Sequence, residues 1–267
     1  MKDVKHQKNA ILLRELVKTD FKLRYQNSAL GYLWALLKPL LMFAILYVVF
    51  TKILRFGDGI PHYPVYLLVG TVFWNFFTEC TFLGIHAIEM RGDLIRKVNF
   101  PKYIVVISAT STALINLLIN VGVILIFALI NGCTLSLSWL LVIPSIIELY
   151  VLALGISLWL GAINVKLRDI GSIWEVITQA LFYAVPIIYP ISMVTSVSTA
   201  AANIILVNPI AQAIQDVRHN IVTDQTVTTW EFVGVVWGLV SVLVVIAVLV
   251  FGAFYFKRRS RKFAEEV

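Results

Sequence analysis

The apolar stretch that decides the fold class is FVGVVWGLVSVLVVIAVLVFGAFYF, residues 232–256, which contains no Asp, Glu, Lys or Arg. A helix needs about 20 mostly apolar residues to cross the roughly 30 Å hydrocarbon core of a bilayer. The composition of the chain agrees with such a span, because 60% of its 267 residues are hydrophobic and only 14% are charged. An average soluble domain carries about 25% charged residues. The sequence therefore predicts an all-α integral membrane protein.

Five further stretches have the composition of membrane spans. The long uncharged region between Lys102 and Glu148 is divided by Asn131-Gly132, a pair that favours a turn, so it reads as two helices joined by a hairpin. The region 176–215 is also uncharged but is interrupted by proline, and it could cross once or twice. With a single crossing there, the predicted spans are 29–51, 59–78, 103–130, 138–163, 173–189 and 232–256.

The positive charges favour this six-span reading. It places 18 of the 22 Lys and Arg residues on one side of the membrane and three on the other, with Lys38 left inside the first span. Cytoplasmic loops carry an excess of Lys and Arg, so both termini are expected in the cytoplasm. A seventh span would put the basic cluster 257–262 outside. The stretch 194–215 is then expected to form a re-entrant or surface-lying pair of short helices on the outer side, between spans five and six.

The segment before the first span predicts an amphipathic helix at the membrane interface. Residues 9–25 place apolar side chains at helical spacing and charged side chains on the other faces. This helix either anchors the chain or also contacts a partner. Its expected contact residues are Leu16, Phe21, Arg24 and Tyr25.

Several classes of activity lack their sequence signals. There is no Gly-rich phosphate loop, no nucleophile elbow and no His-Glu-x-x-His motif, so the sequence predicts neither an ATPase site nor an enzyme. The two cysteines are too few for a metal site of thiolates, and no metal is expected. The net charge of +7 is interpreted as membrane orientation, without a nucleic-acid partner. One acid well inside a span, Glu148, is thin support for a proton relay.

The aromatic residues allow two interpretations. They form interfacial belts and lipid-facing surface, or their flat faces stack against sugar rings along a substrate pathway. The residues expected to line such a pathway are Phe43, Tyr47, Trp74, Phe77, Phe182, Tyr183 and Tyr189. A lipid diphosphate would additionally need cations at the inner entrance, and Arg24 and Lys38 flank the start of span one.

The stretch LVKTDFKLRYQNSALGYLWALLKPL, residues 16–40, resembles the entry segment of ABC-2 type permeases that export polysaccharides. LIRKVNFP at 94–101 and NVKLRDI at 164–170 resemble the two inner loops of that family. PIIYP at 186–190 resembles the end of its fifth helix, and Asn208-Pro209 resembles the element before its last helix. The resemblance follows nearly the whole chain in the same order.

The resemblance implies a single transmembrane domain over 1–267, with an interface helix at 1–28, the six-span region at 29–256 and a basic cytoplasmic tail at 257–267. It implies a homodimer in the cytoplasmic membrane, paired with two copies of a separate ATPase that binds ATP and Mg²⁺. It also implies a lipid-linked glycan as substrate, such as teichoic acid, O-antigen or a rhamnose-rich wall polymer. The residues implied to couple to the ATPase are Leu94, Arg96, Lys97, Phe100, Asn164, Arg168, Asp169 and Ile170.

Three alternatives stay open on the sequence alone. An ABC-2 permease for a drug or a plain lipid is the nearest. A proton-coupled secondary transporter would need converging ionisable groups at mid-membrane and often an inverted repeat, whereas one acid and no convincing repeat are found. A membrane-embedded glycan-processing enzyme would need paired acids and bases.

Overall fold

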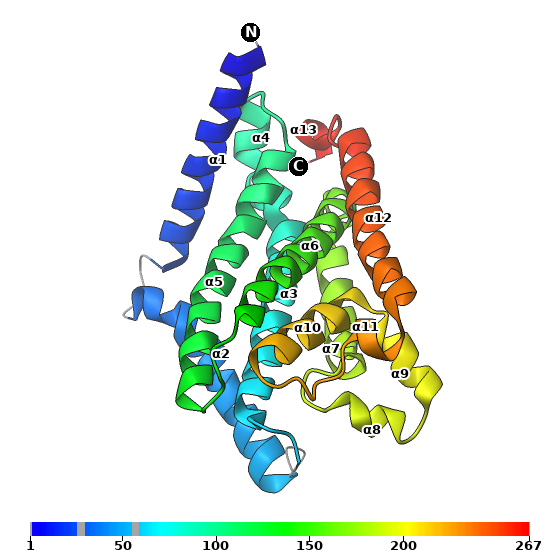
Figure 1. Cartoon of the computed structure of the whole chain (residues 1–267). Coiled ribbons are helices and arrows are strands. Elements are labelled where there is room, and N and C mark those ends of the chain that lie inside the picture. The colour runs from blue at the N-terminus through cyan, green and yellow to red at the C-terminus, as the bar shows by residue number, and fades with distance from the viewer. Residues whose placement is uncertain (1, 26–29, 55–58, 267) are drawn as a thin grey trace.

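The computed structural model describes residues 2–25, 30–54 and 59–266, and this part of the chain is helical without strands (Figure 1). In chain order the helices are α1 (Lys2–Tyr25), η1 (Gly31–Leu33), α2 (Trp34–Tyr47), the π-helical η2 (Val48–Ile53), α3 (Tyr63–Met90), α4 (Gly92–Lys97), α5 (Tyr103–Ile130), η3 (Leu137–Leu141), α6 (Val142–Asn164), α7 (Ile170–Ala184), α8 (Ile191–Thr195), α9 (Thr199–Leu206), α10 (Pro209–Ile221), α11 (Thr229–Phe232), α12 (Val235–Arg259) and α13 (Phe263–Glu266).

Within the described ranges, five helical segments are long and apolar enough to cross a membrane. They are α2 with the first part of η2, α3, α5, η3 with α6, and α12. Four of these agree closely with expected spans. The second span is longer than expected, because α3 continues through Glu79 to Met90.

The expected fifth span, 173–189, corresponds to the shorter helix α7. Its 15 residues make it about 22 Å long at 1.5 Å per residue, less than the hydrocarbon core. The helix stops because Pro186 disfavours helical backbone at the residue before it, and Val185 is extended with φ −93° and ψ 140°. The following stretch, expected as two short helices at 194–215, folds as three: α8, α9 and α10.

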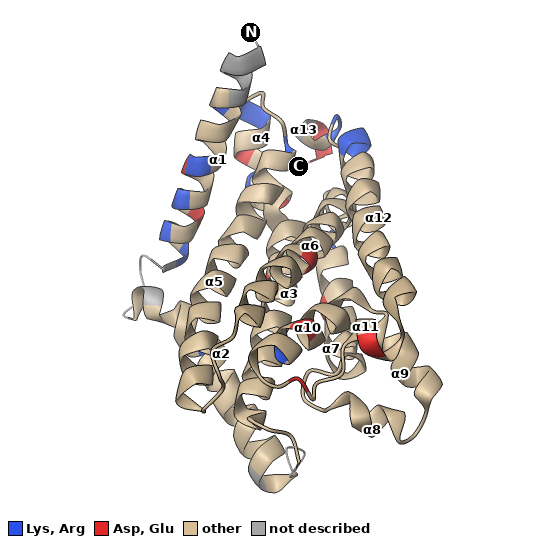
Figure 2. Ribbon diagram, in the orientation of Figure 1, with Lys and Arg blue, Asp and Glu red and all other residues tan. Residues whose placement is uncertain are grey.

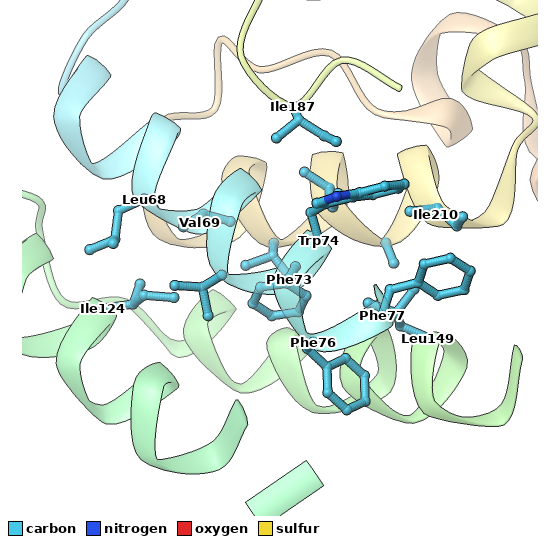
Figure 3. Close-up of a cluster of buried hydrophobic side chains, with 14 of the residues drawn as sticks. Leu68, Val69, Phe73, Trp74, Phe76, Phe77, Ile124, Leu149, Ile187 and Ile210 are labelled. Atoms are coloured by element: carbon cyan, nitrogen blue, oxygen red, sulfur yellow. The ribbon is translucent and has the colours of Figure 1, made fainter. Parts of the chain in front are cut away.

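Helix α3 forms the centre of the molecule and packs against α2, α5, α6, α7 and α10. Figure 3 shows its buried side chains meeting residues from the neighbouring helices. Phe73 and Phe77 are completely buried there. Close approach of helices also depends on glycine, since a Cβ on Gly252 of α12 would lie 2.2 Å from the carbonyl oxygen of Gly155 on α6. Small residues permit this kind of packing between membrane helices.

The two chain ends lie at one end of the molecule together with α1, α4 and α13 (Figure 1). Figure 2 shows Lys and Arg gathered on α1, on α4 and at the end of α12, in this same region. A separate cluster of buried apolar residues joins these elements. It includes Leu16 of α1, Ile95 of α4, Phe100, Phe256 and Phe263. One face of α1 is therefore packed against the protein, whereas several of its charged residues, such as Arg14, Glu15 and Lys18, are exposed.

Arg218 on α10 is one of the three Lys and Arg residues that the six-span reading puts on the outer side, and it is completely buried. Its guanidinium donates hydrogen bonds to the backbone carbonyls of Tyr66, Pro186 and Ile187, and to Oε1 of Gln215. It also lies over the ring of Tyr66, with Cζ 3.5 Å from the ring centroid. The guanidinium thus joins α10, α3 and the interrupted segment after α7.

We expect Arg218→Met to lower the melting temperature of the purified protein by about 5 °C or more, because several buried carbonyls lose their donor. Arg218→Lys should recover little of the lost melting temperature, since an ammonium group cannot reproduce the planar, forked set of donors of the guanidinium. The measurement is thermal unfolding in detergent, with Arg168→Met at an exposed arginine as control. Equal melting temperatures for Arg218→Met and the control would contradict this assignment.

Candidate functional site

A cavity of about 830 Å³ lies between α2, α3, α5 and α7, next to the end of α1. We call it the groove. Its walls combine apolar side chains with cations, carboxylates, amides, hydroxyls and two indoles. The polar and indole residues that line it are Arg24, Lys38, Glu79, Glu175, Asn75, Asn116, Asn120, Thr78, Thr178, Trp34 and Trp174.

The polar side chains of the groove are held in an ordered network. Arg24 of α1 forms an ion pair with Glu79 of α3. Asn116 of α5 donates a hydrogen bond of 2.8 Å from its Nδ2 to Oε1 of the same carboxylate. One turn along α5, Asn120 donates to the backbone carbonyls of Ala35 on α2 and of Asn116. Four helices are therefore joined through polar groups that line the groove.

Helix α1 is attached to α3 and α5 at a second level, one turn before Arg24. Asp20 forms an ion pair with Arg91 near the end of α3. The hydroxyl of Ser108 on α5 donates a hydrogen bond of 2.8 Å to the other carboxylate oxygen of Asp20. At this level the acid, Asp20, belongs to α1. At the level of Glu79 the acid belongs to α3, so the two ion pairs are oriented in opposite directions.

The two cations expected at the inner entrance, Arg24 and Lys38, both line the groove. Of the other residues expected on the interface helix, Leu16 is buried and Phe21 is partly buried. The side chain of Tyr25 lies outside the described residues.

The seven aromatic residues expected along a pathway do not line the groove. Trp74 and Phe77 belong to the core, and Phe182 packs on Trp74 with ring centroids 5.9 Å apart. The Phe43 and Tyr47 rings are neighbours on α2, 5.8 Å apart. Tyr183 is 70% exposed, and its carbonyl accepts a hydrogen bond of 3.0 Å from the Tyr189 hydroxyl.

Sequence reasoning missed the two indoles of the groove, Trp34 and Trp174. The signal for Trp34 was present, since it belongs to the stretch that resembles the permease entry segment. Trp174 lies at the start of α7, and its indole donates a hydrogen bond of 2.9 Å to the hydroxyl of Thr81. Its inward direction depends on this contact with α3, a segment far away in the chain, which the sequence of α7 alone does not record.

The two expected inner loops come together at the end that carries the termini. A small cavity of about 210 Å³ is lined by Arg96 from the first loop and Arg168 from the second, together with Glu89 and Asp93. Arg96 donates a hydrogen bond of 2.9 Å to Asp93. Of the other expected coupling residues, Lys97 and Asp169 are exposed, Leu94 and Ile170 are partly buried, and Phe100 and Asn164 are buried within the chain.

A third cavity, of about 660 Å³, lies between α6, α10, α11 and α12. It is lined by Glu148, the residue considered for a proton relay, and by Asp216, Trp230 and Glu231. The Trp230 indole donates a hydrogen bond of 3.0 Å to Asp216. Burial raises the pKa of Asp216 to about 6, and the hydrogen bond from Trp230 opposes this rise. Within the described ranges, no group of three His, Cys, Asp or Glu residues could hold a metal ion.

Comparison with known proteins decides the family. The family model described as ABC-2 type transporter matches residues 11–222, which is most of the chain and includes every helix that lines the groove. The chain belongs to the ABC-2 type transporter family. The resemblance noted for the sequence is therefore confirmed.

Three known transport proteins are similar to the chain over most of its length. An O-antigen export system permease protein, RfbA, from Klebsiella pneumoniae is 28% identical over 241 residues, 90% of each chain. A protein of the same name from Myxococcus xanthus is 32% identical over 74% of this chain and 75% of its own length. The polysialic acid transport protein KpsM from Escherichia coli is 24% identical over 77% of each chain.

Proposed function

We propose that this ABC-2 chain is the permease subunit of an exporter that moves a lipid-linked polysaccharide across the cytoplasmic membrane. The observation that carries the proposal is the groove, which combines two cations near α1 with amides, hydroxyls and indoles along α3, α5 and α7. The named relatives are permeases or transport proteins for O-antigen and polysialic acid, and they match this chain across three quarters or more of their length.

The chemistry of the groove suits a polymer that must move. A chain of many sugars cannot be held tightly at each unit, so shallow contacts are required. Stacking on Trp34 and Trp174 would supply them, at about 1 kcal/mol or less each by analogy with aromatic pairs. Arg24 and Lys38 would receive the phosphate groups of the lipid end. The five expected aromatics that are not buried would form the outer continuation of the pathway, and the buried Trp74 and Phe77 would pack behind it.

The proposed topology keeps six spans, with α7 as a short fifth span and α8 to α10 as the re-entrant segment. The proposed orientation has both termini in the cytoplasm, because the Lys and Arg residues gather on α1, on α4 and at the end of α12, toward the end of the molecule where the termini lie (Figure 2). A homodimer is supported by α2, which lines the groove yet is largely exposed. A second copy packed there would close the groove around a two-fold axis.

ATP hydrolysis is assigned to a separate subunit that binds ATP and Mg²⁺, with two copies in the transporter. The ATPase would move this chain through α4 and the 164–170 loop. The two elements lie close together, because Arg96 and Arg168 line the same small cavity. The exposed side chains of Lys97 and Asp169 would set the contact by charge. The buried Phe100 and Asn164 would fix each loop to its span, so that a displaced loop tilts the attached helices.

Depletion of this chain tests the proposed function directly. We expect a lipid-linked glycan to accumulate inside the cell, because synthesis continues while export stops. Mass spectrometry of the lipid extract measures it, and re-expression of the parental chain is the control. An unchanged extract together with normal surface polymer would contradict the proposal.

Replacing Arg168 and Asp169 together with Ala tests the coupling surface. Both residues are exposed, so the chain should fold and associate with its ATPase, whereas export should fall about tenfold or more and ATP hydrolysis should persist. Surface polymer and ATPase activity are measured on the same preparation, with Lys166→Ala on the same loop as control. Parental export by the double variant would show that the loop is an ordinary turn.

A further inference from the structure

We propose that Glu79 is a specificity-determining residue of the groove. Its carboxylate is paired with Arg24 and competes with anionic ligands, so a ligand must displace it before the ligand can bind Arg24. The inference rests on the proposed function and deepens it. It states which lipid ends the groove accepts: those with two or more negative charges, and not the singly charged phospholipids of the surrounding membrane.

The first step is the position of the carboxylate. Glu79 lies within the apolar helix α3, lines the groove and pairs with Arg24. Its oxygen Oε1 also accepts the hydrogen bond from Asn116. About a quarter of the Glu79 side chain and a third of the Arg24 side chain remain exposed, with relative exposures of 26% and 34%. A ligand in the groove can therefore reach the pair.

The second step is the competition itself. An anion that enters the groove is attracted by Lys38 and Arg24 but repelled by Glu79. To contact the Arg24 guanidinium fully, the anion must replace the Glu79 carboxylate, which is already paired with that guanidinium. A phosphodiester with one negative charge offers no more charge than that carboxylate, so the exchange gives little advantage. A diphosphate offers more charge and more oxygens, and arginine binds phosphate oxygens in a bidentate way.

The third step is what remains when Arg24 turns away. Glu79 keeps its hydrogen bond from Asn116, so the carboxylate is not left without a donor. Helix α1 keeps its second attachment, because Asp20 stays bound to Arg91 and Ser108. The exchange can thus occur at one level of α1 while the helix stays attached at the other.

The test uses the purified transporter in nanodiscs with radiolabelled farnesyl diphosphate as probe. Binding is measured in phosphatidylcholine alone and with about half the lipid replaced by phosphatidylglycerol, which carries one negative charge. For the parental chain we expect phosphatidylglycerol to weaken probe binding only slightly. For Glu79→Gln we expect tighter binding in phosphatidylcholine and a loss of about fivefold or more on adding phosphatidylglycerol, because the competitor is gone.

Glu15→Gln is the matched control, since Glu15 is an exposed acid of α1 that does not line the groove. It corrects for the effect of surface potential on the probe and should behave like the parental chain. Where Glu79→Gln does not assemble, Glu79→Ala makes the same measurement. Equal sensitivity to phosphatidylglycerol in the Glu79 variant and the parental chain, or weaker probe binding by the variant in phosphatidylcholine, would overturn the inference. A parental chain that binds no probe would instead count against the proposed function.

Discussion

The arrangement depends on one constraint: a helix that ends inside a membrane protein leaves carbonyl groups that need donors. The segment after α7 is such a place, because Pro186 breaks the helix and the chain then turns back through short helices. Arg218 supplies the donors, and its guanidinium holds the carbonyls of Pro186 and Ile187 as well as that of Tyr66 on α3. The polar groups of a non-helical segment are satisfied within the protein, as the bilayer requires. The place of α7 beside the groove follows from this connection.

The same helix, α3, has different chemistry on two sides. Toward α5, α6 and α10 it presents a buried apolar surface that includes Phe73 and Phe77 (Figure 3). Toward α1, α2 and α7 it presents Asn75 and Glu79 to the groove. Polar groups in a membrane protein are costly and are expected where they face a cavity or a partner. The division explains how one helix can be both the rigid centre and the wall of a pathway.

The sequence was informative where one physical rule dominates. Length and lack of charge locate α5, α6 and α12, and the motif at 16–40 identified the family that the comparison confirms. The direction in which individual side chains point was harder to predict. Trp74 was expected to face a pathway but belongs to the core, because aromatic side chains occur on several faces of α3 and the sequence alone does not say which face lines the groove. The place of Trp174 in the groove and the buried role of Arg218 depend on contacts between segments far apart in the chain, which no local pattern records.

The central claim is that the lipid-linked glycan travels along the groove. Site-specific photo-crosslinking tests it most directly, with a benzophenone residue in place of Met42, which lines the groove, or of Val244 on α12, which does not. Both side chains are exposed, so both positions should accept the probe. The account predicts an adduct with the lipid-linked glycan at residue 42 and none at residue 244 in actively exporting membranes. Adducts at residue 244 with none at residue 42 would contradict it.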